Sequence, residues 1–183
     1  MKKLISLSLA LLLCVCCGMC MPVDTRAVTA EENAPFDVAA ESAVLMEAGT
    51  GKVLYAKNAN EALPPASVTK VMTLLLVMEA IDSNTLSLED TVSVSEYAAS
   101  MGGSQVFLEP FEEMSVEDML KSVVVSSAND AAVALAEKVG GSEEAFVKRM
   151  NEKAAQLGME NTNFENVTGL DDDTVNHVLS AMD

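Results

Sequence analysis

Ser67 and Lys70 are the residues of this chain whose types and spacing most clearly suggest chemistry. They stand three apart in the string Ser67-Val68-Thr69-Lys70, at the start of a stretch that predicts a helix of about four turns ending near Ile81. On a helix this spacing puts the hydroxyl and the amine on one face. The positive end of the helix dipole and partial desolvation both disfavour the ammonium form. A neutral lysine amine can take the proton of a serine hydroxyl, which makes a nucleophile.

A plainer interpretation treats the same stretch as a buried core helix. It is apolar on nearly every face, and a helix of that kind usually lies inside the protein. Lys70 would then simply extend its ammonium group to solvent. An S-x-x-K string also occurs by chance about once in a chain of this length, so the surrounding sequence has to decide.

A second pair of polar residues, Ser127 and Asn129, interrupts two predicted helices. The hydroxyl of Ser127 could relay a proton to a leaving group, and the amide of Asn129 could hold a substrate carbonyl group. The alternative is that one of the two residues only caps the helix that begins at Asp130.

The elements that would position these residues can be read from periodicity and turn signals. A glycine-rich turn between two short apolar runs predicts a hairpin, and serine caps and C-terminal glycines delimit several helices. The predicted elements are strands at 42–47, 52–56 and 91–94, short extended pieces at 105–108 and 164–168, a helical turn at 96–100, and helices at 67–81, 115–125, 130–139 and 142–157. The pattern indicates one domain without internal repeats.

Residues 1–30 differ from the rest and predict a secretory signal peptide. Lys2 and Lys3 precede an apolar run that lasts to Met21, and the small residues Val28 and Ala30 have the spacing of a cleavage site. An uncleaved membrane anchor is the alternative, because the run is long. In either case we expect residues from about 31 onward to be exported to the extracytoplasmic face of a bacterial envelope.

Composition excludes several classes of function for the exported part. All four cysteines lie in residues 1–30, so disulfides, thiolate metal sites and cysteine nucleophiles are excluded from the remainder. Removal of three basic residues and one acidic residue in that segment changes the net charge from −17 to −19. Such a surface argues against nucleic acid and anionic membranes as partners.

Histidine chemistry is also limited, because His177 is the only histidine of the chain. A serine–histidine triad or a metal site with several histidines therefore cannot be built. We expect His177 to be a surface residue. The acidic run 171–173 lacks the glycine turn and distal glutamate of a calcium loop, and it is expected to be a solvated loop.

Taken in order, these segments resemble the serine penicillin-recognising enzymes, and most closely the low-molecular-mass penicillin-binding proteins that act as D-alanyl-D-alanine carboxypeptidases. The resemblance covers residues 40–183. It implies an α/β (α+β) fold of the β-lactamase/transpeptidase type, with a helical cluster packed on an antiparallel sheet. The segments that carry it are Glu47-Ala48-Gly49-Thr50-Gly51-Lys52, Pro65-Ala66-Ser67-Val68-Thr69-Lys70, Gly102-Gly103-Ser104, Ser127-Ala128-Asn129-Asp130 and Asn166-Val167-Thr168-Gly169-Leu170.

The resemblance also implies roles for four residues. Ser67 would be the acyl-ester nucleophile and Lys70 its base, Ser127 would pass a proton to the leaving D-alanine, and Asn129 would bind the substrate backbone. The backbone N–H of Ser67 would form half of an oxyanion hole. The implied reaction removes the terminal D-alanine of peptidoglycan stem peptides without a metal or other cofactor, and β-lactam antibiotics would acylate Ser67.

One expected motif is absent, since the family's K-T-G or K-S-G string occurs nowhere in this sequence. The chain also stops within what looks like a capping box, Ser180-Ala181-Met182-Asp183. We therefore expect residues 31–183 to be the N-terminal part of a carboxypeptidase domain, C-terminally truncated and lacking the last sheet strands. The alternatives are a non-catalytic fragment and a serine β-lactamase of the same fold. A membrane would be contacted only through the signal segment or an absent C-terminal anchor.

Overall fold

The computed structural model describes residues 38–170 and 174–183, which belong to a unit that spans residues 31–183. The predicted signal segment and the acidic run 171–173 lie outside the described residues. Among the residues that are described, no helix combines the length and the apolar character needed to cross a bilayer.

The predicted hairpin is confirmed. Strand β1 (Ala43–Met46) pairs antiparallel with strand β2 (Val53–Lys57), and the register slips between Leu45 and Met46. The Glu47 carboxylate closes the turn by accepting hydrogen bonds from the backbone N–H groups of Gly49 and Thr50, at 2.8 and 2.7 Å. A hydrogen bond from the Thr50 hydroxyl, together with these two backbone bonds, lowers the pKa of Glu47.

The predicted helix at 67–81 is present, with a tighter first turn than expected. Residues Ala66–Thr69 form a 3₁₀ turn (η1), and the α-helix α2 follows as Lys70–Asp82. The expectation that this helix is buried on every side is wrong. Its buried side includes Leu76 and Val77, whereas Val71 is 67% exposed and Met78 is 50% exposed.

A second small sheet joins strand β3 (Thr91–Ser93) to strand β4 (Glu113–Ser115) in antiparallel register. Strand β3 and the helical turn α3 (Glu96–Ala99) were predicted, but β4 was not. Three residues with one apolar side chain give too short a pattern to identify a strand from sequence alone. The predicted extended piece 105–108 is not a strand.

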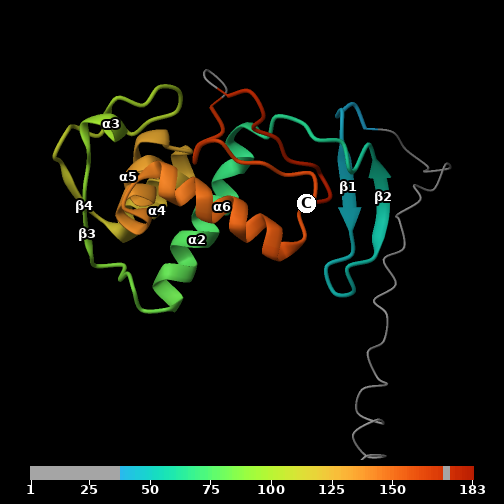
Figure 1. The fold of residues 1–183 in the computed structure, drawn as a ribbon, viewed down its shortest axis with the longest axis horizontal. Coiled ribbons are helices and arrows are strands. Elements are labelled where there is room, and N and C mark those ends of the chain that lie inside the picture. Colours follow the sequence, from blue (N-terminus) through green and yellow to red (C-terminus); the bar gives the residue numbers. More distant parts are fainter. Residues whose placement is uncertain (1–37, 171–173) are drawn as a thin grey trace, which may run out of the picture. The chain divides into compact units, whose positions relative to one another are not determined.

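Three further helices form the cluster that carries the core (Figure 1). They are α4 (Val116–Ser126), α5 (Asn129–Gly140) and α6 (Glu143–Leu157), and all three were predicted. Helix α5 is buried from its first residue through Ala136 and packs against α2, α4 and α6. Its alanines permit this close packing, because small side chains let neighbouring helices approach.

The predicted helix ends are confirmed by their hydrogen bonds. The hydroxyl of Ser115 accepts the N–H of Asp118, and the hydroxyl of Ser142 accepts the N–H of Ala145. Gly158 ends α6 in the left-handed conformation, with φ of 76°.

A buried carboxylate ties the loop before β4 to helix α5. Asp130 is fully buried and accepts hydrogen bonds from the backbone N–H groups of Val106, Leu108 and Ala131. A buried charge needs such partners, because an unpaired carboxylate in the interior is very costly. Asp130 therefore fixes loop 104–108 next to the segment that holds Ser127 and Asn129.

The segment after α6 returns to the start of α2. Its backbone forms isolated bridges between Asn163 and Val178 and between Leu63 and Leu179. Figure 1 shows this segment, in red, beside the N-terminal end of α2. Residues more than ninety positions apart in the sequence thus meet at the Ser67 turn.

Candidate active site

The structure places the side chains of Ser67 and Lys70 in contact. The Lys70 amine donates a hydrogen bond to the Ser67 hydroxyl oxygen at 3.2 Å and a second one to the Thr168 carbonyl oxygen at 2.9 Å. The 3₁₀ turn followed by the first residue of α2 accounts for this arrangement, because residues three apart then lie on one face. The predicted pairing of hydroxyl and amine is therefore confirmed.

Lys70 is buried, which excludes the interpretation that its ammonium group extends to solvent. Only 3% of the residue is exposed, so its amine does not extend into solvent. Desolvation lowers the pKa of Lys70 from its ordinary value of 10.5 to about 8. Ser67, by contrast, is exposed. The site thus joins an accessible hydroxyl to a buried amine that is neutral in about a tenth of molecules at pH 7.

The turn 166–170 supplies the carbonyl group that holds the Lys70 amine. Its central glycine, Gly169, has φ of 83° and lies against the backbone of Ala66. A Cβ atom at Gly169 would stand 1.8 Å from the Ala66 carbonyl oxygen, so only glycine fits there. Ala66 itself has φ of 45°, a conformation that costs a residue other than glycine about 1 kcal/mol. The residue preceding the predicted nucleophile is thus held in a strained backbone conformation.

Ser127 and Asn129 do not cap helix α5, which excludes the plainer interpretation of this pair. The N-cap residue of α5 is Ala128, and its side chain makes no capping bond. Ser127 ends α4 with φ of 55°, and the Asn129 amide nitrogen donates to the Gly102 carbonyl oxygen at 2.8 Å. The other amide atom of Asn129, the oxygen Oδ1, is buried without a hydrogen-bond partner within the described chain. A buried free acceptor is unusual and suggests a place for an incoming donor.

The two predicted motifs meet through the turn 166–170. At one side its Thr168 carbonyl binds Lys70, and at the other its Leu170 side chain lies against Gly103. A Cβ atom at Gly103 would stand 2.8 Å from the Asn129 amide nitrogen. Contacts therefore run from Lys70 through the turn 166–170 and Gly103 to Asn129.

The expectation that His177 lies on the surface is wrong. It is 6% exposed, and its Nε2 atom lies 2.7 Å from the Thr69 hydroxyl oxygen. Its Nδ1 atom accepts hydrogen bonds from the backbone N–H groups of Glu165 and Asn166, at 3.0 and 3.4 Å. Because Nδ1 accepts, the proton of the neutral ring sits on Nε2 and is donated to Thr69. His177 thus ties the segment before the turn to the residue that precedes Lys70.

Three residues that fix the Ser67 site from distant positions in the sequence were not predicted, namely Thr168, Asn166 and His177. The turn-closing role of Asn166 could have been predicted from sequence, because asparagine followed by glycine three residues later is typical of a turn closed by the asparagine side chain. The histidine carried no local signal, since its partners lie far away in the sequence.

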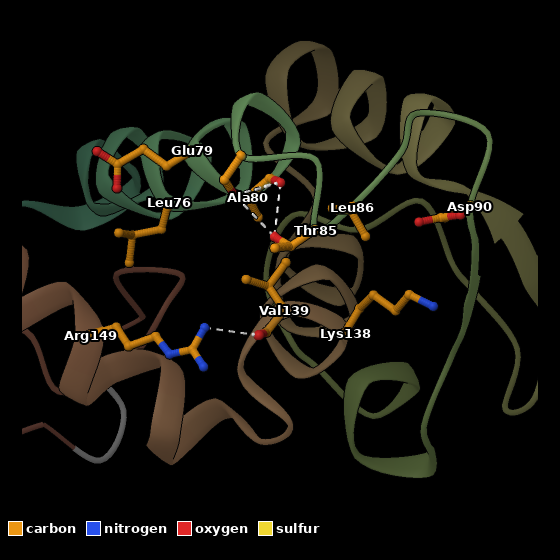
Figure 2. A pocket seen from close by; sticks show the side chains of 10 residues that line it. Leu76, Glu79, Ala80, Thr85, Leu86, Asp90, Lys138, Val139 and Arg149 are labelled. Carbon is orange, nitrogen blue, oxygen red and sulfur yellow. Dashed lines mark hydrogen bonds between the residues drawn. The ribbon is translucent and has the colours of Figure 1, made fainter.

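A hollow of about 520 Å³ lies elsewhere, between the end of α2 and the helices α5 and α6 (Figure 2). Two of its polar side chains are bonded to the chain itself, as Figure 2 shows: Arg149 donates to the Val139 carbonyl and the Thr85 hydroxyl to the Ala80 carbonyl. None of the predicted site residues lines it. The hollow is therefore not part of the Ser67 site.

The geometry places the Ser67 hydroxyl beside a lysine amine, and the histidine His177 is bonded to Thr69 instead. Comparison with known proteins agrees. Residues 27–183 match the family model described as D-alanyl-D-alanine carboxypeptidase, and the chain belongs to that family. The predicted family is thereby confirmed.

Individual relatives give the same answer. The chain is 59% identical over 144 residues to D-alanyl-D-alanine carboxypeptidase DacF of Bacillus subtilis, which covers 79% of this chain and 36% of the relative. It is 44% identical over 140 residues to DacC of Escherichia coli, which covers 73% of this chain and 35% of the relative. The chain thus spans about a third of the length of these curated relatives.

Solved structures show the same fold. The carboxypeptidase DacD from Francisella tularensis superimposes with a TM-score of 0.78 at 36% identity, over 81% of this chain and 36% of that one. Penicillin-binding protein D2 from Listeria monocytogenes, in its ampicillin-bound form, superimposes with a TM-score of 0.69 at 32% identity, over 78% of this chain and 57% of that one. The α+β fold of the penicillin-binding proteins, predicted from sequence, is confirmed.

Replacement of Gly169 tests the close contact between the turn 166–170 and the Ser67 turn. We expect Gly169→Ala to lower the free energy of unfolding by at least ~3 kcal/mol, because the new methyl group forces the two backbones apart. Gly158→Ala is the matched control, since Gly158 has a similar φ of 76° but open space around its Cα. It should cost only the ~1 kcal/mol of the left-handed conformation. Urea unfolding followed by circular dichroism measures both, and equal losses would contradict the contact.

Proposed function

We propose that this chain carries the nucleophile-bearing part of a serine D-alanyl-D-alanine carboxypeptidase. The observation that carries the proposal is the hydrogen bond between the buried Lys70 amine and the exposed Ser67 hydroxyl. The substrate is a peptidoglycan stem peptide that ends in D-Ala-D-Ala. The names of the curated relatives support this substrate class.

The first half of the reaction forms an acyl-enzyme. The neutral Lys70 amine takes the proton of the Ser67 hydroxyl, and the serine oxygen attacks the carbonyl carbon of the penultimate D-alanine. When the tetrahedral intermediate collapses, the bond to the terminal D-alanine breaks. The leaving amine receives a proton from the Lys70 ammonium, relayed by the Ser127 hydroxyl. The products of this step are free D-alanine and an ester on Ser67.

The second half hydrolyses the ester. Lys70, neutral again, takes a proton from a water molecule, which attacks the ester carbonyl carbon. The Ser67 oxygen leaves and recovers its proton from the lysine, which releases the shortened peptide. A penicillin follows the first half as a substrate mimic. The ampicillin-bound relative from Listeria monocytogenes supports that part of the proposal.

Asn129 binds the substrate backbone in this scheme. Its Oδ1 atom is buried and has no partner in the described chain, whereas its amide nitrogen is already bonded to Gly102. An acceptor held in this way fits a peptide N–H donor, and such a bond removes the desolvation cost of the free oxygen, about 1–3 kcal/mol.

We further propose that residues 1–30 direct export and that the enzyme works at the extracytoplasmic face of the cell envelope, where peptidoglycan lies. The charged N-terminus, apolar run and small-residue site in the sequence support this location. A role in peptidoglycan maturation, and hence in cell shape, follows from the substrate.

Two rival functions make different predictions. A serine β-lactamase of the same fold would turn over a penicillin and release no D-alanine from a stem peptide. A non-catalytic fragment would do neither, and the absence of a K-[ST]-G string favours it. The carboxypeptidase proposal predicts a lasting penicilloyl adduct together with D-alanine release.

Replacement of the nucleophile provides the direct test. We expect the chain to become labelled by a fluorescent penicillin and to release D-alanine from a diacyl-D-Ala-D-Ala peptide. Ser67→Ala should lose both activities by at least about a thousandfold. Ser83→Ala, at the opposite end of α2, is the control and should behave like the parent. Equal labelling of Ser67→Ala and the parent would sink the assignment of the nucleophile.

The pH dependence of labelling tests the base. Because the lowered pKa of Lys70 is about 8, the neutral amine increases as pH rises through that value. The rate of labelling should therefore rise about tenfold from pH 7 to a plateau above pH 9, with a midpoint near 8. A rate that stays constant or falls over this range would speak against Lys70 as the base.

A further inference from the structure

Asn166 organises the turn that faces Lys70. Its side-chain oxygen accepts hydrogen bonds from the backbone N–H groups of Gly169, at 2.7 Å, and Thr168, at 3.1 Å. Its side-chain nitrogen donates to the Leu170 carbonyl oxygen at 2.6 Å. One half-buried amide thus bonds three backbone groups of the turn.

The bond to Gly169 matters most because of peptide geometry. The N–H of Gly169 and the carbonyl group of Thr168 belong to the same planar peptide unit, so they point in opposite directions. When Asn166 fixes the N–H on one side, the carbonyl oxygen is aimed to the other side. That oxygen lies 2.9 Å from the Lys70 amine.

Other anchors of this segment act on different peptide units. His177 holds the N–H groups of Glu165 and Asn166, Glu143 accepts the N–H of Val167, and Thr73 donates to the Val167 carbonyl. The titratable side chains facing the segment, those of His177, Glu143 and Glu165, are bonded to backbone N–H groups. Of these side chains, Asn166 is the one that bonds to the Thr168–Gly169 peptide unit, which faces Lys70.

We infer that Asn166 is a positioning residue for the base: through the Thr168–Gly169 peptide unit it fixes the direction of the Lys70 amine toward Ser67. A neutral amine has two N–H groups and one lone pair. One N–H of the Lys70 amine is hydrogen-bonded to the Thr168 carbonyl oxygen. The lone pair of the amine can then point toward the Ser67 hydroxyl. That Lys70 acts as a base rests on the proposed function, whereas the contacts of Asn166 and Lys70 with the Thr168–Gly169 peptide unit do not.

Titration of Lys70 by ¹³C NMR of its Cε atom provides the test, with the signal identified by its loss in Lys70→Arg. In Asn166→Ala the ammonium form loses an acceptor while the site remains buried, so the midpoint should fall by about half a pH unit, a threefold change in proton affinity. An unchanged or raised midpoint overturns the inference. A raised midpoint would mean that Asn166 only keeps water out.

Asn151→Ala is the matched control. Asn151 is also half-buried, and its amide also bonds backbone of the same segment, the N–H and carbonyl of Phe164, at 2.8 Å each. Its loss should leave the Lys70 midpoint unchanged. An equal shift in this variant would reduce Asn166 to a general anchor of the segment and overturn the inference.

A second variant covers the case in which Asn166→Ala does not fold. Asn166→Asp keeps the acceptor for the Gly169 N–H, so its Lys70 midpoint should be no lower than that of the parent, and a lower one overturns the inference. Penicillin labelling is measured in parallel. If the parent chain is not labelled, the proposed function fails, whereas the titration still decides the role of Asn166.

Discussion

The burial of one lysine amine is the constraint on which the rest of this site depends. An ammonium group in the interior is costly unless it is paired, and the Lys70 amine is bonded to two neutral oxygens, one from Ser67 and one from Thr168. The fold therefore lowers the pKa of this group, to about 8. Between that value and 10.5 the unfolded chain binds more protons than the folded one, so the unfavourable contribution of Lys70 to stability is relieved as pH rises through this window.

Several features with no obvious local purpose are explained by this lysine. The left-handed Ala66 and the close approach of Gly169 bring the turn 166–170 against the Ser67 turn. His177 bonds the backbone at the start of that turn, and the Asn166 side chain bonds the backbone of Gly169. A strained backbone residue, Ala66, and several buried polar contacts therefore meet at the Ser67 turn.

The sequence predicted what is set locally. The Ser67–Lys70 pairing follows from helical spacing, and the ends of α6 follow from Ser142 and Gly158, so both could be predicted. The partners of Lys70 and Thr69 could not, because Thr168 is 98 residues away from Lys70 and His177 is 108 residues away from Thr69. The open face of α2 was missed for the same reason, since an apolar pattern does not show which faces receive a covering element. The roles of Ser127 and Asn129 stay predictions, supported by the loss of the capping alternative and by the free Asn129 oxygen.

Lys70 is buried beside Ser67 and loses its proton at a pH of about 8. The most direct measurement is the titration midpoint of Lys70 in the unmodified chain, followed by ¹³C NMR of selectively labelled lysine. We expect a midpoint near 8, well below the ordinary lysine value of 10.5. A midpoint close to 10.5 would contradict it, because Lys70 would then be a solvated cation at neutral pH and Ser67 would have no base beside it.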